Sequence, residues 1–131
     1  MKQKIGYVSV LVRDYDEAIT YYTRMLGFRL LEDTRLDEEK RWVLVSPPGA
    51  EGALLLAKAR KESELAGVGW QAGGRVFLFL HTDDFWRDYS AMKTRGVTFL
   101  EEPRRETYGT VVVFADLYGN KWDLLEPRSQ G

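Results

Sequence analysis

Hydrophobic and polar positions in the first part of the chain follow two different periods. Residues 5–12 (IGYVSVLV) are rich in β-branched side chains and predict a strand. Beyond them, apolar residues recur at helical spacing, at Ile19, Tyr22, Met25 and Leu26. Asp14 is placed as an N-cap with Glu17 at the third helical position, and Gly27 is a typical helix stop. The stretch therefore predicts a strand followed by a short amphipathic helix.

Short apolar runs bounded by turn residues predict further strands. They cover residues 28–33, 42–45 and 53–57, although the last run is also compatible with a short buried helix. The charged residues 34–41 are typical of a hairpin tip or loop. Residues 58–75 are first charged and then glycine-rich, so we expect a connection between two halves rather than another domain.

The rest of the chain predicts the same order of elements. Residues 76–81 (VFLFLH) predict a strand, and Asp83-Asp84 precede a helix whose apolar face is formed by Phe85, Tyr89 and Met92. Further strands are expected over residues 97–102, 110–114 and 121–126.

The two halves align as an internal duplication. Asp84 lies 70 residues after Asp14, and Gly96, which ends the second helix, lies 69 residues after Gly27. Each half predicts strand–helix–strand–strand–strand, and one such four-stranded unit would be marginal alone. We therefore expect an α+β fold in which two βαβββ repeats form a curved mixed sheet around a cavity. The repeats would pair within one chain or across a homodimer.

One domain is expected to contain both repeats. A chain of 131 residues has the usual length of a single domain. The first repeat is expected over about residues 4–58, the connection over 59–75 and the second repeat over about 76–127.

Composition narrows the range of partners. Apolar residues make up 44% of the chain and aromatic residues 13%, enough for a real core. The 19 basic and 20 acidic residues nearly cancel, which gives no reason to expect nucleic acid or a membrane as a partner. Cysteine is absent, which excludes disulfides, thiolate zinc sites and thiol nucleophiles within this chain. No signal peptide or membrane span is indicated, and a cytoplasmic protein is expected.

His81 is the only histidine. A site of two histidines and one carboxylate, or of three histidines, cannot be built within this chain. A hard divalent cation held by carboxylates and carbonyls remains compatible with the sequence.

Two motifs give the chain a resemblance to a known family. The first ends the first helix, with Tyr21, Tyr22, Leu26, Gly27 and Phe28. The second ends the chain, with Asp116, Gly119, Asn120, Trp122 and Leu124. Over about residues 4–127 the chain resembles the vicinal oxygen chelate superfamily, which includes glyoxalase I, bleomycin-resistance and fosfomycin-resistance proteins and extradiol dioxygenases. The motifs indicate the fold and carry little about the reaction.

The resemblance also implies where metal ligands would lie. Metal-dependent members place four ligands on the concave face, typically His, Glu or Gln, His or Gln, and Glu. The corresponding positions here are Tyr7, Leu55 or Leu56, Phe77, and Asp123. Three of the four are poor or impossible ligands, so the chain resembles a member whose metal site is degenerate, and no metal cofactor is expected. Asp123 is then expected to contact a bound ligand, or else to be partly solvated and structural.

Strand alternation selects the other candidate residues. Tyr7 and Ser9 share one face of their strand, and Phe77, Phe79 and His81 share one face of theirs. The residues that we expect to bind a ligand are Tyr7, Ser9, Trp42, Leu56, Phe77, Phe79, Tyr108 and Asp123. Several of these aromatic residues could instead be ordinary core, and Tyr108 could simply pack a turn. Trp122 has the parity opposite to Asp123 and is expected to pack under a helix.

His81 and Asp123 are the candidate catalytic residues. An imidazole can act as a general base or hydrogen-bond donor near neutral pH. The alternative is a histidine at a strand end that bonds only to backbone or water.

Three functions remain open on the sequence alone. The first is a homodimer that binds a small apolar or aromatic molecule in its cavity without the usual metal. The second is a lyase, isomerase or dioxygenase-type enzyme that acts on a small carbonyl or aromatic substrate with a weakly bound divalent metal. The third is an interaction domain without a ligand.

Overall fold

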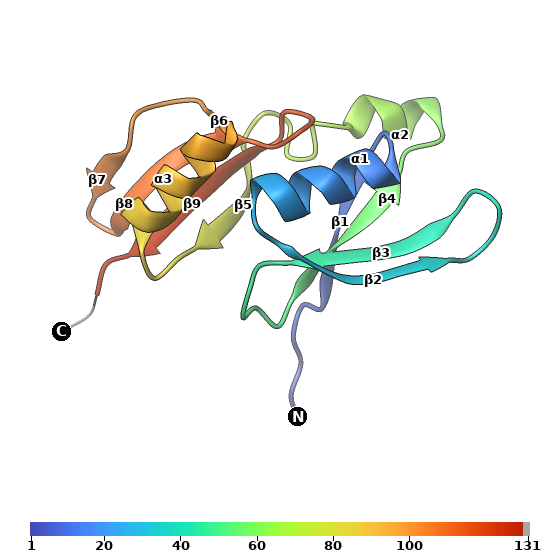
Figure 1. The fold of residues 1–131 in the computed structure, drawn as a ribbon, viewed down its shortest axis with the longest axis horizontal. Helices are drawn as coiled ribbons and strands as arrows, with labels where there is room; N and C mark the ends of the chain where they lie inside the picture. Colours follow the sequence, from blue (N-terminus) through green and yellow to red (C-terminus); the bar gives the residue numbers. More distant parts are fainter. Residues whose placement is uncertain (130–131) are drawn as a thin grey trace. The chain divides into compact units, whose positions relative to one another are not determined.

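The computed structural model describes residues 1–129, and the chain divides into two compact units, with the boundary between Val68 and Gly69. Each unit contains its own sheet (Figure 1). The boundary lies within the glycine-rich part of the predicted connection.

The first unit is built from one four-stranded sheet with helical segments. Its elements are β1 (Tyr7–Val12), α1 (Tyr15–Thr20), the π-helical segment η1 (Tyr21–Met25), β2 (Arg29–Arg35), β3 (Arg41–Ser46), β4 (Ala53–Lys58) and α2 (Glu62–Gly67). The strand order is β1-β4-β3-β2. Only the β1–β4 pair is parallel. The run 53–57 is therefore a strand, and the alternative of a buried helix is wrong.

The second unit repeats this plan. Its elements are β5 (Val76–His81), α3 (Phe85–Arg95), β6 (Thr98–Phe99), β7 (Arg104–Glu106), β8 (Gly109–Ala115) and β9 (Lys121–Pro127). The order is β5-β9-β8-β6, with β7 paired to β8, and only the β5–β9 pair is parallel. The predicted α+β fold with two βαβββ repeats is thus confirmed.

Aspartate caps begin the main helix of each repeat, as the sequence predicts. Asp14 Oδ2 accepts the Glu17 N–H at 2.8 Å, and Asp84 Oδ1 accepts the Arg87 N–H at 3.2 Å. These bonds satisfy N–H groups that have no partner within the helix. Gly96 ends α3 in the left-handed region at φ 93°, a conformation that glycine adopts without a Cβ clash.

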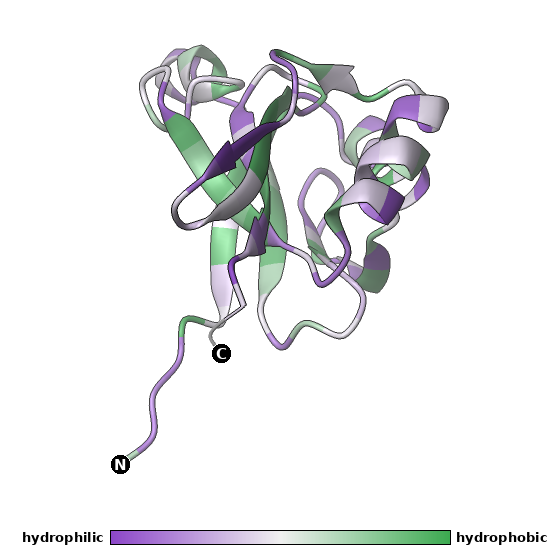
Figure 2. Ribbon diagram, turned by 90° about the vertical axis from the view of Figure 1, so that its left-hand side faces the viewer, coloured by the Kyte–Doolittle hydropathy of each residue, from purple (hydrophilic) through white to green (hydrophobic). Residues whose placement is uncertain are grey.

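In the first unit the fully buried apolar side chains of the strands lie on one face of the sheet. Val10 and Val12 of β1 are fully buried, as are Val43 and Val45 of β3. Ala18 and Tyr22, from the helical segments, are buried as well. In Figure 2 the apolar residues are concentrated along strands, and polar residues are more frequent in the connecting segments. The alternate positions of β1 are therefore left to face away from this core.

In the second unit a chain of rings links the sheet to α3. Trp122 of β9 is stacked on Phe114, with ring centroids 5.7 Å apart. Phe114 contacts Phe99, and Phe99 contacts Tyr89 of α3 at 4.7 Å. The indole N–H of Trp122, which is 3% exposed, donates to Asp116 Oδ2 at 3.1 Å. The predicted packing of Trp122 under a helix is confirmed.

The predicted strand 97–102 is wrong in its length. Only Thr98 and Phe99 pair as β6, and pairing with β8 resumes at β7. Between them Pro103 has no N–H to donate, and Glu101 Oε2 accepts the Val113 N–H at 3.2 Å. The Val113 N–H thus has a side chain as its partner, while the Val113 carbonyl still accepts the backbone N–H of Leu100 at 2.9 Å.

The helix α2 was not expected in the connection. Glu64 Oε1 accepts the backbone N–H groups of Arg60 and Lys61, which stabilises the start of this short helix. None of the helices in residues 1–129 has the length and apolar character that a membrane span needs.

Candidate functional site

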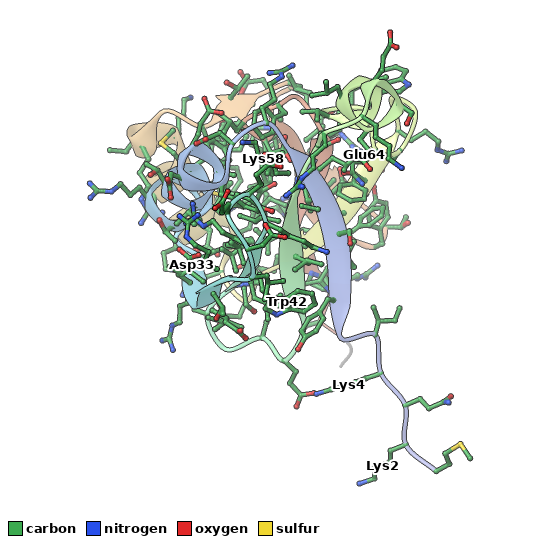
Figure 3. The ribbon with its side chains drawn as sticks, turned by 90° about the vertical axis from the view of Figure 1, so that its right-hand side faces the viewer. Lys2, Lys4, Asp33, Trp42, Lys58 and Glu64 are labelled. Carbon is green, nitrogen blue, oxygen red and sulfur yellow. The ribbon has the colours of Figure 1, made fainter. Side chains whose placement is uncertain are left out.

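In the first unit, the sheet face opposite the core carries aromatic side chains. Tyr7 and Ser9 alternate with the buried positions of β1 and are exposed, as the alternation predicts. The Tyr7 ring, 55% exposed, meets the ring of Trp42 edge-on at a centroid distance of 6.1 Å. β4 lies between their strands. Trp42 is labelled in Figure 3.

Strand register decides which leucine of β4 shares this face. Leu55 is aligned with Ser9, whereas Leu56 is aligned with Val10 and is fully buried. Leu56 therefore lies on the core side, and its expected place among ligand-binding residues is corrected: Leu55 is the β4 leucine on the face of Tyr7 and Ser9. The sequence alone did not decide between Leu55 and Leu56. Alternation shows which residues of one strand share a face, but it does not show how that strand is aligned with its neighbour.

In the second unit, the sheet face opposite α3 carries Asp123. Its register partners are Phe79 of β5 and Val113 of β8. Trp122 packs against the rings that lead to α3, so Asp123, its neighbour along β9, faces the other side. The side chain of Asp123 is 5% exposed.

Asp123 has a buried oxygen without a partner. Among residues 1–129, Oδ1 of Asp123 is the one buried side-chain oxygen or nitrogen that makes no hydrogen bond. A buried polar atom without a hydrogen bond is unfavourable, and more so when it is charged. Asp123 therefore destabilises the free protein, and a bound molecule that supplies a donor would relieve this cost.

The electrostatic surroundings of Asp123 favour its neutral form. Burial raises the pKa of Asp123 above its ordinary value, because removal from water disfavours the carboxylate. The positive charge of Arg104 lowers this pKa and the negative charge of Glu101 raises it, and both effects are smaller than that of burial.

Arg104 is the centre of an ion cluster on β7. Its Nε donates to Glu101 Oε2 at 2.8 Å, and its Nη1 donates to Glu106 Oε1 at 2.7 Å. Hydrogen bonds to Glu106, Glu101 and Tyr108 raise the pKa of Arg104 above its ordinary value. Glu101 and Glu106 therefore already bond the cation whose charge lowers the pKa of Asp123. Sequence reasoning missed this ion cluster, although the charged run EEPRRE over residues 101–106 could have indicated it.

The candidate residues of β5 are only partly placed as expected. Phe79 is aligned with Asp123 and His81 with Leu125, so both lie on the face of Asp123. Phe79 is 60% exposed, and His81 is exposed at the strand end. Phe77 falls at an irregularity between Val76 and Leu78, where the register shifts, so alternation does not assign it to this face.

Tyr108 lies in the turn between β7 and β8 and is 49% exposed. Its backbone carbonyl accepts the Arg128 N–H at 2.9 Å. At the following Gly109, a Cβ atom would lie 2.1 Å from the carbonyl oxygen of Glu126. The small size of Gly109 is therefore required by the close approach of β9.

The residues do not fit a resident metal ion. The ligand positions implied by the family resemblance hold Tyr7, Leu55, Phe77 and Asp123, and only the last is a carboxylate. Within residues 1–129 no group of three or more histidine, aspartate or glutamate side chains is arranged to hold a metal. A metal site of the family's usual kind would need donors that these positions lack.

The fold and the motifs agree with a family comparison. The profile of the Glyoxalase/Bleomycin resistance protein/Dioxygenase superfamily matches residues 4–124, and the chain belongs to this superfamily. An uncharacterized protein of Shewanella frigidimarina (strain NCIMB 400) is 56% identical over 128 residues, with 96% of this chain and 95% of that protein covered.

Two solved structures share the fold closely. The structure of UcmS2 has a TM-score of 0.84 and 30% identity, and the match covers 96% of this chain and 99% of UcmS2. The structure of TnmS3, described as an antibiotic binding protein from Streptomyces sp. CB03234, has a TM-score of 0.79 and 29% identity. That match covers 97% of this chain and 98% of TnmS3.

Proposed function

We propose that this chain is a binding protein for small aromatic molecules, which it holds by ring packing and without a metal. The observation that carries the proposal is the chemistry of the implied ligand positions. The positions that the family resemblance implies for metal ligands hold rings at Tyr7 and Phe77 and an aliphatic chain at Leu55. The description of TnmS3 as an antibiotic binding protein supports the same class of function.

Exposed rings give such a ligand its contacts. Phe79 and Tyr7, each more than half exposed, lie on sheet faces rather than in loops. Covering an exposed aromatic ring contributes roughly 25 cal/mol for each Å² of apolar surface, and ring pairs add about 0.5–1.5 kcal/mol. A planar aromatic ligand can gain both contributions, whereas a small polar molecule gains neither.

Several expectations accompany this proposal. We predict that the protein is a homodimer. We also predict that the protein acts in the cytoplasm. Sedimentation velocity of the full chain tests the homodimer, and a molar mass of one chain at micromolar concentration would contradict it.

The test of ligand binding is calorimetric titration of the full chain with planar aromatics. We suggest 1-methoxynaphthalene, 1-naphthol and anthraquinone as probes. Phe79→Ala is expected to weaken binding about tenfold, since it removes a stacking ring. Trp86→Ala is the matched control, because Trp86 is a ring of similar exposure on α3 rather than on the sheet face. Failure of every probe to bind, or equal weakening by both variants, would overturn the proposal.

A second candidate is an enzyme that acts on a small carbonyl or aromatic substrate. The raised pKa of Asp123 favours it, because such shifts are common among catalytic carboxyls. His81, on the same sheet face, would exchange protons with the substrate. Turnover that His81→Ala and Asp123→Asn both abolish, with ligand affinity kept, would support this function. Unchanged turnover in both variants would exclude these roles.

A further inference from the structure

We propose that Asp123 recognises a hydroxyl or amino group on the aromatic ligand. The ligand class is then a hydroxylated or amino-substituted aromatic, such as a naphthol, rather than an aromatic hydrocarbon or ether. This inference rests on the proposed binding function and adds a specificity-determining residue to it.

The first observation is the unpartnered oxygen. Oδ1 of Asp123 is closed to solvent and accepts no hydrogen bond from residues 1–129, although the side chain is 95% removed from solvent. The unpartnered Oδ1 accepts a hydrogen bond whether or not the other oxygen of the carboxyl holds a proton, so a molecule that relieves this cost brings an O–H or N–H donor. Water competes poorly at an oxygen that it does not reach, so a donor from a ligand gains more there than at the surface.

The second observation is that the fold does not require a carboxylate at this position. Leu55 is the equivalent of Asp123 in the first repeat: it is aligned with Ser9 on the first strand, as Asp123 is aligned with Phe79. Ser9 and Phe79 each lie five residues before the capping aspartate of their own repeat. A strand in the same topological place thus accepts an aliphatic side chain, and the polar group in β9 has no structural partner to explain it.

The third observation is that Arg104, the cation whose charge acts on Asp123, is already engaged. Arg104 donates to Glu101 at 2.8 Å and to Glu106 at 2.7 Å. Two carboxylates therefore share this guanidinium, and Asp123 has no ion pair with it. An Asp123–Arg104 ion pair would explain the buried carboxylate without a ligand, and the geometry does not show one.

A donor can reach Asp123 from the exposed ring beside it. Phe79, aligned with Asp123 across the parallel pair, is 60% exposed, so little packing resists a change of its rotamer. A half-turn of the carboxylate about χ2 also exchanges its two oxygens. When this ring turns aside, a ligand that packs against it can bring a substituent on its ring edge to Asp123.

The test compares two probes of nearly the same shape. 1-Naphthol carries an O–H donor, and 1-methoxynaphthalene has an ether oxygen in its place. Calorimetric titration of the wild-type full chain is expected to show tighter binding of 1-naphthol by about tenfold or more, the usual value of a hydrogen bond to a charged or buried acceptor. Asp123→Val should bring the ratio close to one without loss of affinity for 1-methoxynaphthalene.

A conservative variant and a direct signal complete the experiment. Asp123→Asn keeps an acceptor oxygen and should retain part of the preference, which a merely structural role would not predict. In the wild-type protein, the ¹³C resonance of the Asp123 carboxyl should shift on addition of 1-naphthol and stay in place with 1-methoxynaphthalene. This signal needs no variant and holds even if Asp123→Val fails to fold.

The outcomes separate this inference from the proposed function. Equal affinity of the wild type for both probes overturns the role of Asp123 and leaves aromatic binding standing. A preference that survives in Asp123→Val overturns the inference in the same way. Absence of binding by both probes and by anthraquinone overturns the proposed function and, with it, this inference.

Discussion

Leu55 and Asp123 occupy the same register position in the two repeats, one beside Ser9 and the other beside Phe79. One sheet therefore holds an aliphatic chain where the other holds a buried carboxylate without a hydrogen bond. A group that is unfavourable for folding and has a tolerated apolar counterpart in the same chain is a candidate for function rather than for stability.

Replacement of Asp123 by valine should stabilise the protein. Valine is apolar, close in size and suited to a strand, so Asp123→Val removes a buried unpartnered carboxyl without a large cavity. We expect the free energy of unfolding at pH 7 to rise by about 1–3 kcal/mol, measured by urea denaturation. Leu55→Val is the matched control in the first repeat and should lose about 1 kcal/mol, the value of one methylene. A loss of stability in Asp123→Val would show that an interaction of this carboxyl has been overlooked.

Stability should depend on pH through Asp123 in a defined direction. Its pKa in the folded protein is raised, whereas an aspartate in the unfolded chain has a pKa of about 3.9. Between these two values the folded state binds more protons than the unfolded state, so the free energy of unfolding falls as pH rises. The contribution of Asp123 to the free energy of unfolding is therefore most favourable below the pKa of aspartate in the unfolded chain. It is lost as the pH rises through the pKa of Asp123 in the folded protein.

The comparison of wild type with Asp123→Asn isolates this effect from the other carboxyls. The asparagine variant lacks the titration, so its stability advantage should grow from about pH 4 upward and then level off above the folded pKa of Asp123. Urea denaturation of both proteins in steps between about pH 4 and pH 8 measures the difference. A difference that is independent of pH would mean that burial does not raise this pKa.

The ion cluster on β7 should tune Asp123 in two opposite directions. Arg104→Gln removes the positive charge that lowers the pKa of Asp123, so the pKa should rise further. Glu101→Gln removes a negative charge that raises it, so the pKa should fall. Titration of the Asp123 carboxyl by ¹³C NMR in the two variants checks both signs. Shifts of the same sign would indicate that the variants act by rearranging β7 rather than by charge.

Local signals in the sequence were enough to predict the repeats and their helices. The caps at Asp14 and Asp84 and the stop at Gly96 act within four residues, so no distant contact was needed to place them. The alternation that puts Trp122 on the helix side is likewise local. The duplication of these signals then implied the same order of elements along the chain in both halves.

The candidate site was harder to predict because it depends on register. The choice between Leu55 and Leu56, and the shift at Phe77, are set by pairing with β1 and β9, which no spacing within one strand reveals. The role of Glu101 as the partner of the Val113 N–H depends on a contact between residues 12 positions apart. Such contacts link the strands that frame Asp123.

Gly69 and Gly73 offer a final, sharply matched prediction about the segment that leads into β5. Both have positive φ, 75° and 65°, so an alanine at either position meets the strain of the left-handed region, about 1–2 kcal/mol. A Cβ at Gly69 would also lie 1.9 Å from the carbonyl oxygen of Tyr118, whereas a Cβ at Gly73 meets nothing within 4 Å. Gly69→Ala should therefore cost clearly more than Gly73→Ala, by about 2 kcal/mol or more in urea denaturation, because backbone must move to relieve the clash.

The Gln71 N–H donates to Asn120 Oδ1 at 3.1 Å, so the same displacement should weaken protection of the Gln71 amide in hydrogen exchange. Equal costs for the two variants would mean that this segment does not pack on the turn at Tyr118 in solution.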